Sequence, residues 1–221
     1  MAGADTDGDL VTLTARPDAF DLDHYVVTDD FFGRPYVDLD EWRAEPAPHR
    51  HVHGGFEGTD TRFTFYFPPS ESYAGRMYQP LEGANAGHED SFGNEHGNLL
   101  GGLEMITRLG GYMVESNMGH IGDVFDPKAG KDKTIYAFRA AAECARFSKF
   151  LARQVYGQAP HHSYVWGGSG GGRRSPGCLE YAPDVWDGAL PFMGGGETED
   201  HGTLGELTGG GGNFPFMFNV Q

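Results

Sequence analysis

Apolar and polar residues alternate along several short stretches of the chain, and this pattern predicts strands. Residues 61–67 and 76–81 carry aromatic and aliphatic side chains at strand spacing, and a proline pair closes the first stretch. Residues 111–117 predict a further strand, and the aromatic run at 163–167 predicts a short buried one. The last strand of the series is predicted at 187–192.

One long stretch, residues 134–156, follows helical spacing instead. Its apolar residues recur at intervals close to those of one helix face, as a stripe of Ile135, Phe138, Ala142, Ala145, Leu151 and Val155. Gly157 follows directly and can end the helix in a left-handed conformation. A shorter helix is predicted for residues 98–109. A kinked or shortened helix is predicted after residue 169, because Pro176 interrupts it.

The first 48 residues are rich in Asp and Pro, with scattered aromatic side chains. They predict short strands at 10–14 and 25–28 within an irregular N-terminal arm, either laid over the domain or flexible. Residues 49–221 form the domain itself. Its order of strand, helix, strand, glycine-rich turn, helix and strand predicts an α/β fold. We expect a mostly parallel sheet with flanking helices and with the strand at 163–167 near its centre.

Length and composition narrow the classes of function. A chain of 221 residues with 38% hydrophobic residues can form one globular domain with a sizeable core. The formal net charge of −16 argues against nucleic acid or an anionic membrane as a partner. The sequence shows neither a membrane-length apolar run nor a secretion signal, so we expect a cytoplasmic protein. Its two cysteines, Cys144 and Cys178, predict neither a disulfide framework nor a zinc site.

The glycine-rich stretch after residue 166 carries the strongest chemical motif. Gly167, Ser169 and Gly171 fit the pattern G-x-S-x-G, in which a strand turns sharply into a helix and presents a serine hydroxyl. Small residues are needed two positions before and after the serine, because larger side chains would collide across the turn. Since the chain contains 35 glycines, a β-to-α turn without chemistry is the alternative.

A nucleophilic serine of this kind needs hydrogen-bond donors for the oxyanion that forms during acyl transfer. The backbone N–H of Gly170, at the start of the following helix, is the first predicted donor. The loop after the strand at 76–81 is spaced by glycine and predicts the second donor, from Gly83 or Ala84.

Three histidines alternate along the chain at His49, His51 and His53, so that on a strand they would share one face. Three imidazoles on one face could bind zinc, with Glu57 as a fourth ligand. The alternative is the exposed face of an edge strand. We favour that interpretation and predict no metal site.

With these segments in order, the chain resembles the α/β-hydrolases, in particular the branch of tannases and feruloyl esterases. The resemblance is carried by residues 111–120, by the long helix, and by residues 163–172 and 181–189. It implies a small-molecule carboxylic ester as substrate, acylation of Ser169, release of the acid by water, and no cofactor. Those esterases often carry a cysteine directly before the nucleophile. This chain departs from them in having Gly168 there.

In that fold an acid and a histidine follow the nucleophile along the chain. Only 52 residues follow Ser169, and His201 is the one histidine among them. The adjacent Asp200 could hardly orient it, because neighbouring side chains do not face one another. We therefore expect a fragment that lacks the acid and the histidine of the triad and hydrolyses esters poorly, with His120 lining the substrate pocket. The alternative is a non-catalytic binding or scaffold domain that retains the hydrolase fold.

Overall fold

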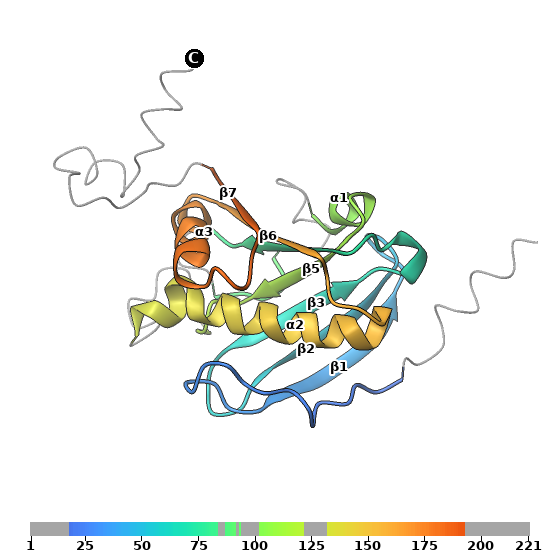
Figure 1. Cartoon of the computed structure of the whole chain (residues 1–221), viewed down its shortest axis with the longest axis horizontal. Coiled ribbons are helices and arrows are strands. Elements are labelled where there is room, and N and C mark those ends of the chain that lie inside the picture. The colour runs from blue at the N-terminus through green and yellow to red at the C-terminus, as the bar shows by residue number, and fades with distance from the viewer. Residues whose placement is uncertain (1–17, 84–86, 92, 94–101, 122–131, 193–221) are drawn as a thin grey trace, which may run out of the picture.

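Seven strands form one mixed sheet at the centre of the molecule (Figure 1). The computed structural model describes residues 18–83, 87–91, 93, 102–121 and 132–192. Across the sheet the strands stand in the order β1-β2-β3-β5-β4-β6-β7. Their bounds are Pro35–Arg43 for β1, His49–Phe56 for β2, Arg62–Phe67 for β3, Arg76–Leu81 for β4, Gly111–Ser116 for β5, His162–Gly168 for β6 and Gly188–Phe192 for β7.

The sheet has an antiparallel and a parallel half. β1, β2, β3 and β5 pair antiparallel in turn, whereas β5, β4, β6 and β7 pair parallel. The strands predicted at 76–81, 111–117, 163–167 and 187–192 make up the parallel half. The predicted α/β fold, with a parallel sheet around the glycine-rich turn, is therefore confirmed. β6 lies between β4 and the edge strand β7, so its predicted position near the centre of the sheet is wrong.

Helices cover both faces of the sheet. Their bounds are Leu103–Arg108 for α1, Ala140–Tyr156 for α2 and Gly170–Tyr181 for α3, with a 3₁₀ turn η1 at Ser70–Ser72 and a π-helix η3 at Ile135–Arg139. α2 crosses the sheet in the foreground of Figure 1, and α3 packs into the same core. On the other face, Leu103 and Ile106 of α1 pack with Tyr66 and Trp166. Within the described ranges, no helix combines the length and apolarity that a bilayer span requires.

Aromatic rings fill the space between the sheet and α2. Phe147 of α2 is fully buried, and its ring centroid lies 5.4 Å from that of Phe63 and 6.0 Å from those of Phe56 and Phe65. Strand alternation sends these phenylalanines to the face that α2 covers. Because each ring buries a large apolar area, this cluster holds the helix on the sheet.

The long helix agrees with its predicted apolar stripe. Four of the six stripe residues are buried, and the other two are half-buried against the same core. Gly157 ends the helix with φ 75°, as predicted. The first part of the predicted helix, residues 135–139, is π-helical.

The structure corrects two local predictions. α3 continues through Pro176 to residue 181, so the expected shortened helix is wrong. Packing of α3 against the sheet offsets the hydrogen bond that proline cannot make. Residues 25–28 form no strand, because Tyr25 and Thr28 instead bind Glu143 of α2. The Tyr25 hydroxyl and the Thr28 N–H donate to Glu143 Oε1 at 2.7 and 3.0 Å. The strand predicted at 10–14 lies outside the described residues.

The first strand of the sheet also lies where the sequence predicted irregular structure. Asp38 and Asp40 of β1 are residues that favour turns when they are judged from sequence alone. In the sheet, Arg50 of β2 donates to both Asp40 oxygens at 2.8 and 2.6 Å, and Asp38 lies 2.6 Å from His53 Nδ1. Such cross-strand pairs stabilise a strand that its own residues disfavour. The sheet therefore begins at residue 35, before the predicted domain boundary at 49.

Replacing Phe147 with alanine should destabilise the fold strongly, because a fully buried ring is removed from between α2 and the sheet. We expect the free energy of unfolding, measured by urea titration, to fall by about 3–5 kcal/mol. Phe31→Ala is the control, since that ring is 44% exposed and its loss should cost less than about 1 kcal/mol. Similar losses in the two variants would contradict the importance of the cluster.

Candidate active site

Ser169 lies at the turn between β6 and α3 in a conformation that side chains rarely adopt. Its φ is 54° and its ψ is −115°, and the residue is exposed. Its N–H donates to the Phe192 carbonyl at 3.1 Å, and its own carbonyl accepts the N–H of Arg173 at 3.0 Å. Such strain costs about 1–3 kcal/mol and persists only where the surrounding structure enforces it. The predicted strand-to-helix turn is present, while the catalytic role of the serine stays a prediction.

Glycine is required on both sides of this turn because backbone segments meet there. A Cβ on Gly171 would lie 2.1 Å from the carbonyl oxygen of Leu81, and one on Gly167 would lie 2.5 Å from the carbonyl carbon of Gly171. Both clashes involve backbone atoms, which cannot rotate aside as a side chain can. The first turn of α3 therefore rests directly on the end of β4.

The two strands that carry the predicted oxyanion donors end side by side. The register pairs Leu81 of β4 with Gly167 of β6, so Gly83 and Ser169 each lie two residues beyond that pair. A Cβ on Gly83 would lie 3.8 Å from the Gly168 carbonyl oxygen. Gly170 begins α3, where the first amides have no partner within the helix. The structure thus brings Gly83 and Gly170 to one edge of the sheet. Their role as donors stays a prediction, and Ala84 lies outside the described residues.

The loop that carries Gly83 is held at several points. The Glu82 carboxylate accepts a hydrogen bond from the Ser91 hydroxyl at 2.9 Å, which closes the loop on itself. The backbone carbonyl of Glu82 accepts a hydrogen bond from Arg174 of α3. Farther along, Glu89 Oε1 lies 3.1 Å from Nε2 of His53 on β2. The loop is therefore tied both to α3 and to the antiparallel half of the sheet.

The three alternating histidines share one face of β2, as predicted. The rings of His49 and His51 pack against Tyr66, with centroids 5.4 and 5.2 Å from it. Burial lowers the pKa of His49 to about 4 and that of His51 to about 3, so both are neutral near pH 7. β1 covers the outer side of β2, and the predicted exposed edge strand is therefore wrong.

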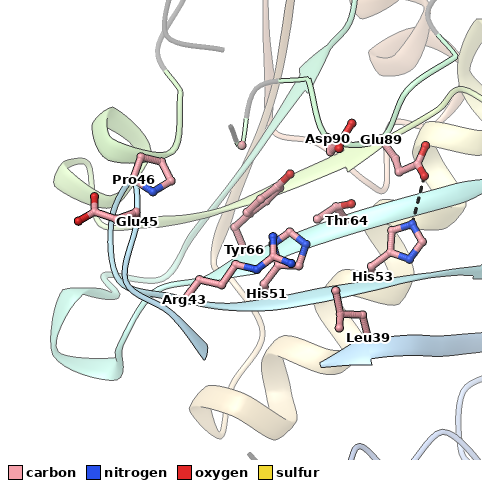
Figure 2. A pocket seen from close by; sticks show the side chains of 11 residues that line it. Leu39, Arg43, Glu45, Pro46, His51, His53, Thr64, Tyr66, Glu89 and Asp90 are labelled. Atoms are coloured by element: carbon pink, nitrogen blue, oxygen red, sulfur yellow. Dashed lines mark hydrogen bonds and ion pairs between the residues drawn. The ribbon is translucent and has the colours of Figure 1, made fainter. Parts of the chain in front are cut away.

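His53 differs from its two neighbours because two carboxylates hold it. Its Nδ1 lies 2.6 Å from Asp38 Oδ1. Its Nε2 lies 3.1 Å from Glu89 Oε1, the contact drawn in Figure 2. The hydrogen bond to Glu89, together with the one to Asp38, raises the pKa of His53 despite partial burial. Among the residues that the structure describes, no three His, Cys, Asp or Glu side chains gather in a group that could hold a metal ion.

A polar pocket of about 640 Å³ opens beside His51 and His53. Figure 2 shows Tyr66 and Thr64 of β3 on one side of it and Glu89 of the loop above it. The predicted nucleophile is not among its lining residues. This pocket is therefore separate from the turn at residue 169.

His120, which was predicted to line the substrate pocket, is buried beyond the carboxyl end of β5. It is 3% exposed, and its ring centroid lies 5.7 Å from that of Tyr136. The Arg174 guanidinium lies over the same tyrosine ring, 4.5 Å from its centroid. His120 and Arg174 of α3 therefore lie near the same aromatic ring. Its contribution to substrate binding stays a prediction, and His201 lies outside the described residues.

The sequence reasoning missed two buried polar residues, Arg174 and Glu115. The Glu115 carboxylate accepts hydrogen bonds from the Tyr66 hydroxyl at 2.8 Å and from the Gly93 N–H at 2.9 Å. Charged side chains are expected at the surface unless they are paired. The partners of these two come from segments distant in sequence, so no local spacing could have predicted their burial.

Comparison with known proteins gives structural matches only. No family model matches the chain, and no curated protein matches it in sequence. An esterase from Aspergillus oryzae matches with a TM-score of 0.57 and 16% identity, over 70% of this chain and 34% of that one. Feruloyl esterase B from Aspergillus oryzae matches with a TM-score of 0.52 and 20% identity, over 70% and 33%. A tannin acyl hydrolase from Aspergillus niger gives a TM-score of 0.49 at 19% identity, over 73% and 32%.

The first two matches bear on the fold. This chain has the α/β-hydrolase fold of those esterases, which confirms the predicted resemblance at the level of architecture. The chain spans about a third of the length of each of the two structures. Identities of 16% and 20% carry the fold and not the substrate.

A methyl group on Gly171 should disrupt the turn, because it would meet the Leu81 carbonyl at 2.1 Å. We expect Gly171→Ala to lower the free energy of unfolding by about 1–3 kcal/mol or more. Gly177→Ala on the same helix is the matched control, since its Cβ would meet nothing closer than 4.0 Å. It should stabilise the helix by about 0.5–1 kcal/mol. Urea titration of both variants checks the pair, and a neutral Gly171→Ala would contradict the close contact.

His53 should make stability depend on pH. A raised folded pKa means that protonated His53 contributes stability fully below its unfolded pKa of about 6.5 and loses it as pH rises through the folded value. We expect the wild type to exceed His53→Gln by about 1 kcal/mol at pH 6 and by less at pH 9. His49 and His51 are common to both proteins, so their titration cancels. A difference that stays constant between the two pH values would contradict the charged contact.

Proposed function

We propose that this chain carries the nucleophile and the oxyanion donors of a hydrolase that acts on small carboxylic esters. The single observation that carries the proposal is the conformation of Ser169, exposed at a strained turn between β6 and α3. A protein has no folding reason to hold a serine at φ 54° when glycine would fit without strain. Two solved structures with the same fold are esterases, which supports the choice of reaction.

In the proposed reaction the Ser169 oxygen bonds to the ester carbonyl carbon while its proton passes to a base. The tetrahedral intermediate then collapses, and the alcohol leaves with a proton. Water attacks the acyl-enzyme, releases the acid and restores the serine hydroxyl. Both tetrahedral intermediates carry a negative oxygen, which the N–H groups of Gly170 and Gly83, or of Ala84, would stabilise.

The proposed reaction also needs a base beside Ser169. No described side chain forms a hydrogen bond with the Ser169 hydroxyl, although a serine needs an adjacent base to act as a strong nucleophile. We therefore expect slow turnover from the 221-residue chain. An oxyanion site without its base still gives about 10³–10⁴-fold acceleration over water. His120 is the described histidine that we expect nearest the substrate.

The lack of a described base also favours a second interpretation. In it, the domain retains the turn and the fold as a non-catalytic binding or scaffold module. The two interpretations differ in whether the Ser169 hydroxyl reacts with an electrophile.

We expect Ser169→Ala to abolish labelling by a fluorophosphonate probe and hydrolysis of p-nitrophenyl acetate. Ser70→Ala is the matched control, because Ser70 is exposed in η1 before β4, at the opposite end of the strand from Gly83. That variant should label and hydrolyse like the wild type. His120→Ala should raise KM if this residue lines the pocket, and should lower kcat if it serves as the base. Equal rates for wild type and Ser169→Ala would favour the non-catalytic interpretation.

A further inference from the structure

Arg174 is an arginine placed where the core of the domain meets the candidate active site. It lies in the second turn of α3 and is 3% exposed. Its Nη1 donates to the Tyr136 hydroxyl, and its Nη2 donates to the backbone carbonyl of Glu82. The guanidinium also lies over the Tyr136 ring, 4.5 Å from the centroid. The side chain thus joins α3 to η3 and to the loop after β4.

Burying a guanidinium carries a desolvation cost that its contacts must offset. Burial lowers the pKa of Arg174, which reflects the cost of removing its charge from water. Replacing a buried charged group together with its partners by apolar side chains is often neutral or stabilising, whereas removing one partner alone is destabilising. A contribution to stability alone is therefore a weak explanation for an arginine at this position. The hydrogen bond to the Glu82 carbonyl suggests a functional one.

The bond to Glu82 acts on the very peptide that carries a predicted oxyanion donor. The Glu82 carbonyl and the Gly83 N–H belong to the same peptide group, which is planar and trans. In such a group the C=O and N–H bonds point in opposite directions. Holding the carbonyl toward α3 therefore fixes the direction of the Gly83 N–H.

The same helix also fixes the other parts of the site. α3 begins directly after Ser169, and Gly170 is its first residue. The backbone of Gly171 leaves no space for a Cβ beside the Leu81 carbonyl, so α3 and β4 are held at contact distance. Arg174 then reaches from the next turn of α3 to the residue that follows β4. The positions of the nucleophile and of both predicted donors are therefore all set by their contacts with α3.

We propose that Arg174 is a positioning residue, which aims the Gly83 N–H at the oxyanion by holding the Glu82 carbonyl. This inference rests on the proposed ester hydrolysis at Ser169. It predicts that loss of the guanidinium weakens stabilisation of the tetrahedral intermediate while leaving substrate binding and the fold intact.

The test compares Arg174→Met, Arg174→Lys and Ser169→Ala with the wild-type chain in hydrolysis of p-nitrophenyl acetate. Arg174→Met should lower kcat about 10- to 100-fold, because loss of a whole oxyanion donor costs about 10²–10³-fold. KM should change less than about threefold, since the ground-state ester does not need this donor. Arg174→Lys can still donate to the Glu82 carbonyl and should recover part of kcat. Arg153→Met, at an exposed position of α2, is the control and should match the wild type.

Two further readouts separate positioning from a structural role. Phenylboronic acid forms a tetrahedral adduct with a reactive serine, so its inhibition constant should rise in Arg174→Met in parallel with the loss of kcat. The melting temperature of that variant should fall, because the Tyr136 hydroxyl and the Glu82 carbonyl lose Arg174 as a buried donor, but the variant should stay folded at the assay temperature. A lower melting temperature with unchanged kcat would overturn the positioning role and leave the function of Ser169 standing. Hydrolysis that is absent in the wild type, or equal in Ser169→Ala, would overturn the proposed function and this inference with it.

Discussion

The contact between the first turn of α3 and the end of β4 is the constraint on which the candidate site depends. Gly171 presents bare backbone to the Leu81 carbonyl, and any side chain there would collide with it. Because backbone atoms form the contact on both sides, the helix cannot shift without moving the strand. Ser169 is the residue between β6 and this fixed helix, so its strained conformation follows from the two elements that it joins.

Hydrogen bonds from polar side chains then connect α3 and β2 to the loop after β4. Arg174 holds the Glu82 carbonyl from the side of α3, and His53 holds Glu89 from the side of β2. The Glu82 carboxylate closes the loop internally through Ser91. The described residues of this loop are therefore held by charged and polar contacts. Its geometry is accordingly sensitive to single substitutions and, through His53, to pH.

The N-terminal residues contribute to the same architecture from the outside. Tyr25 and Thr28 lie over α2 and satisfy one oxygen of the buried Glu143, while β1 pairs with the outer edge of β2. Neither arrangement could be predicted from local sequence, because Glu143, Asp40 and Asp38 each bind a partner in another segment. Asp38 and Asp40 favour turns in isolation and form strand only when Arg50 and His53 stand beside them.

The sequence by itself determined the parallel strands, the long helix and the strand-to-helix turn. The spacing of apolar residues indicates which face of an element is buried. Gly167 and Gly171 indicate where the backbones of β6, α3 and β4 come into contact. Only the tertiary structure decided that α3 continues through Pro176, that His49 and His51 are buried, and that Arg174 donates to the Glu82 carbonyl. These features arise from contacts between segments up to about a hundred residues apart, whereas local patterns report only on neighbours within one element.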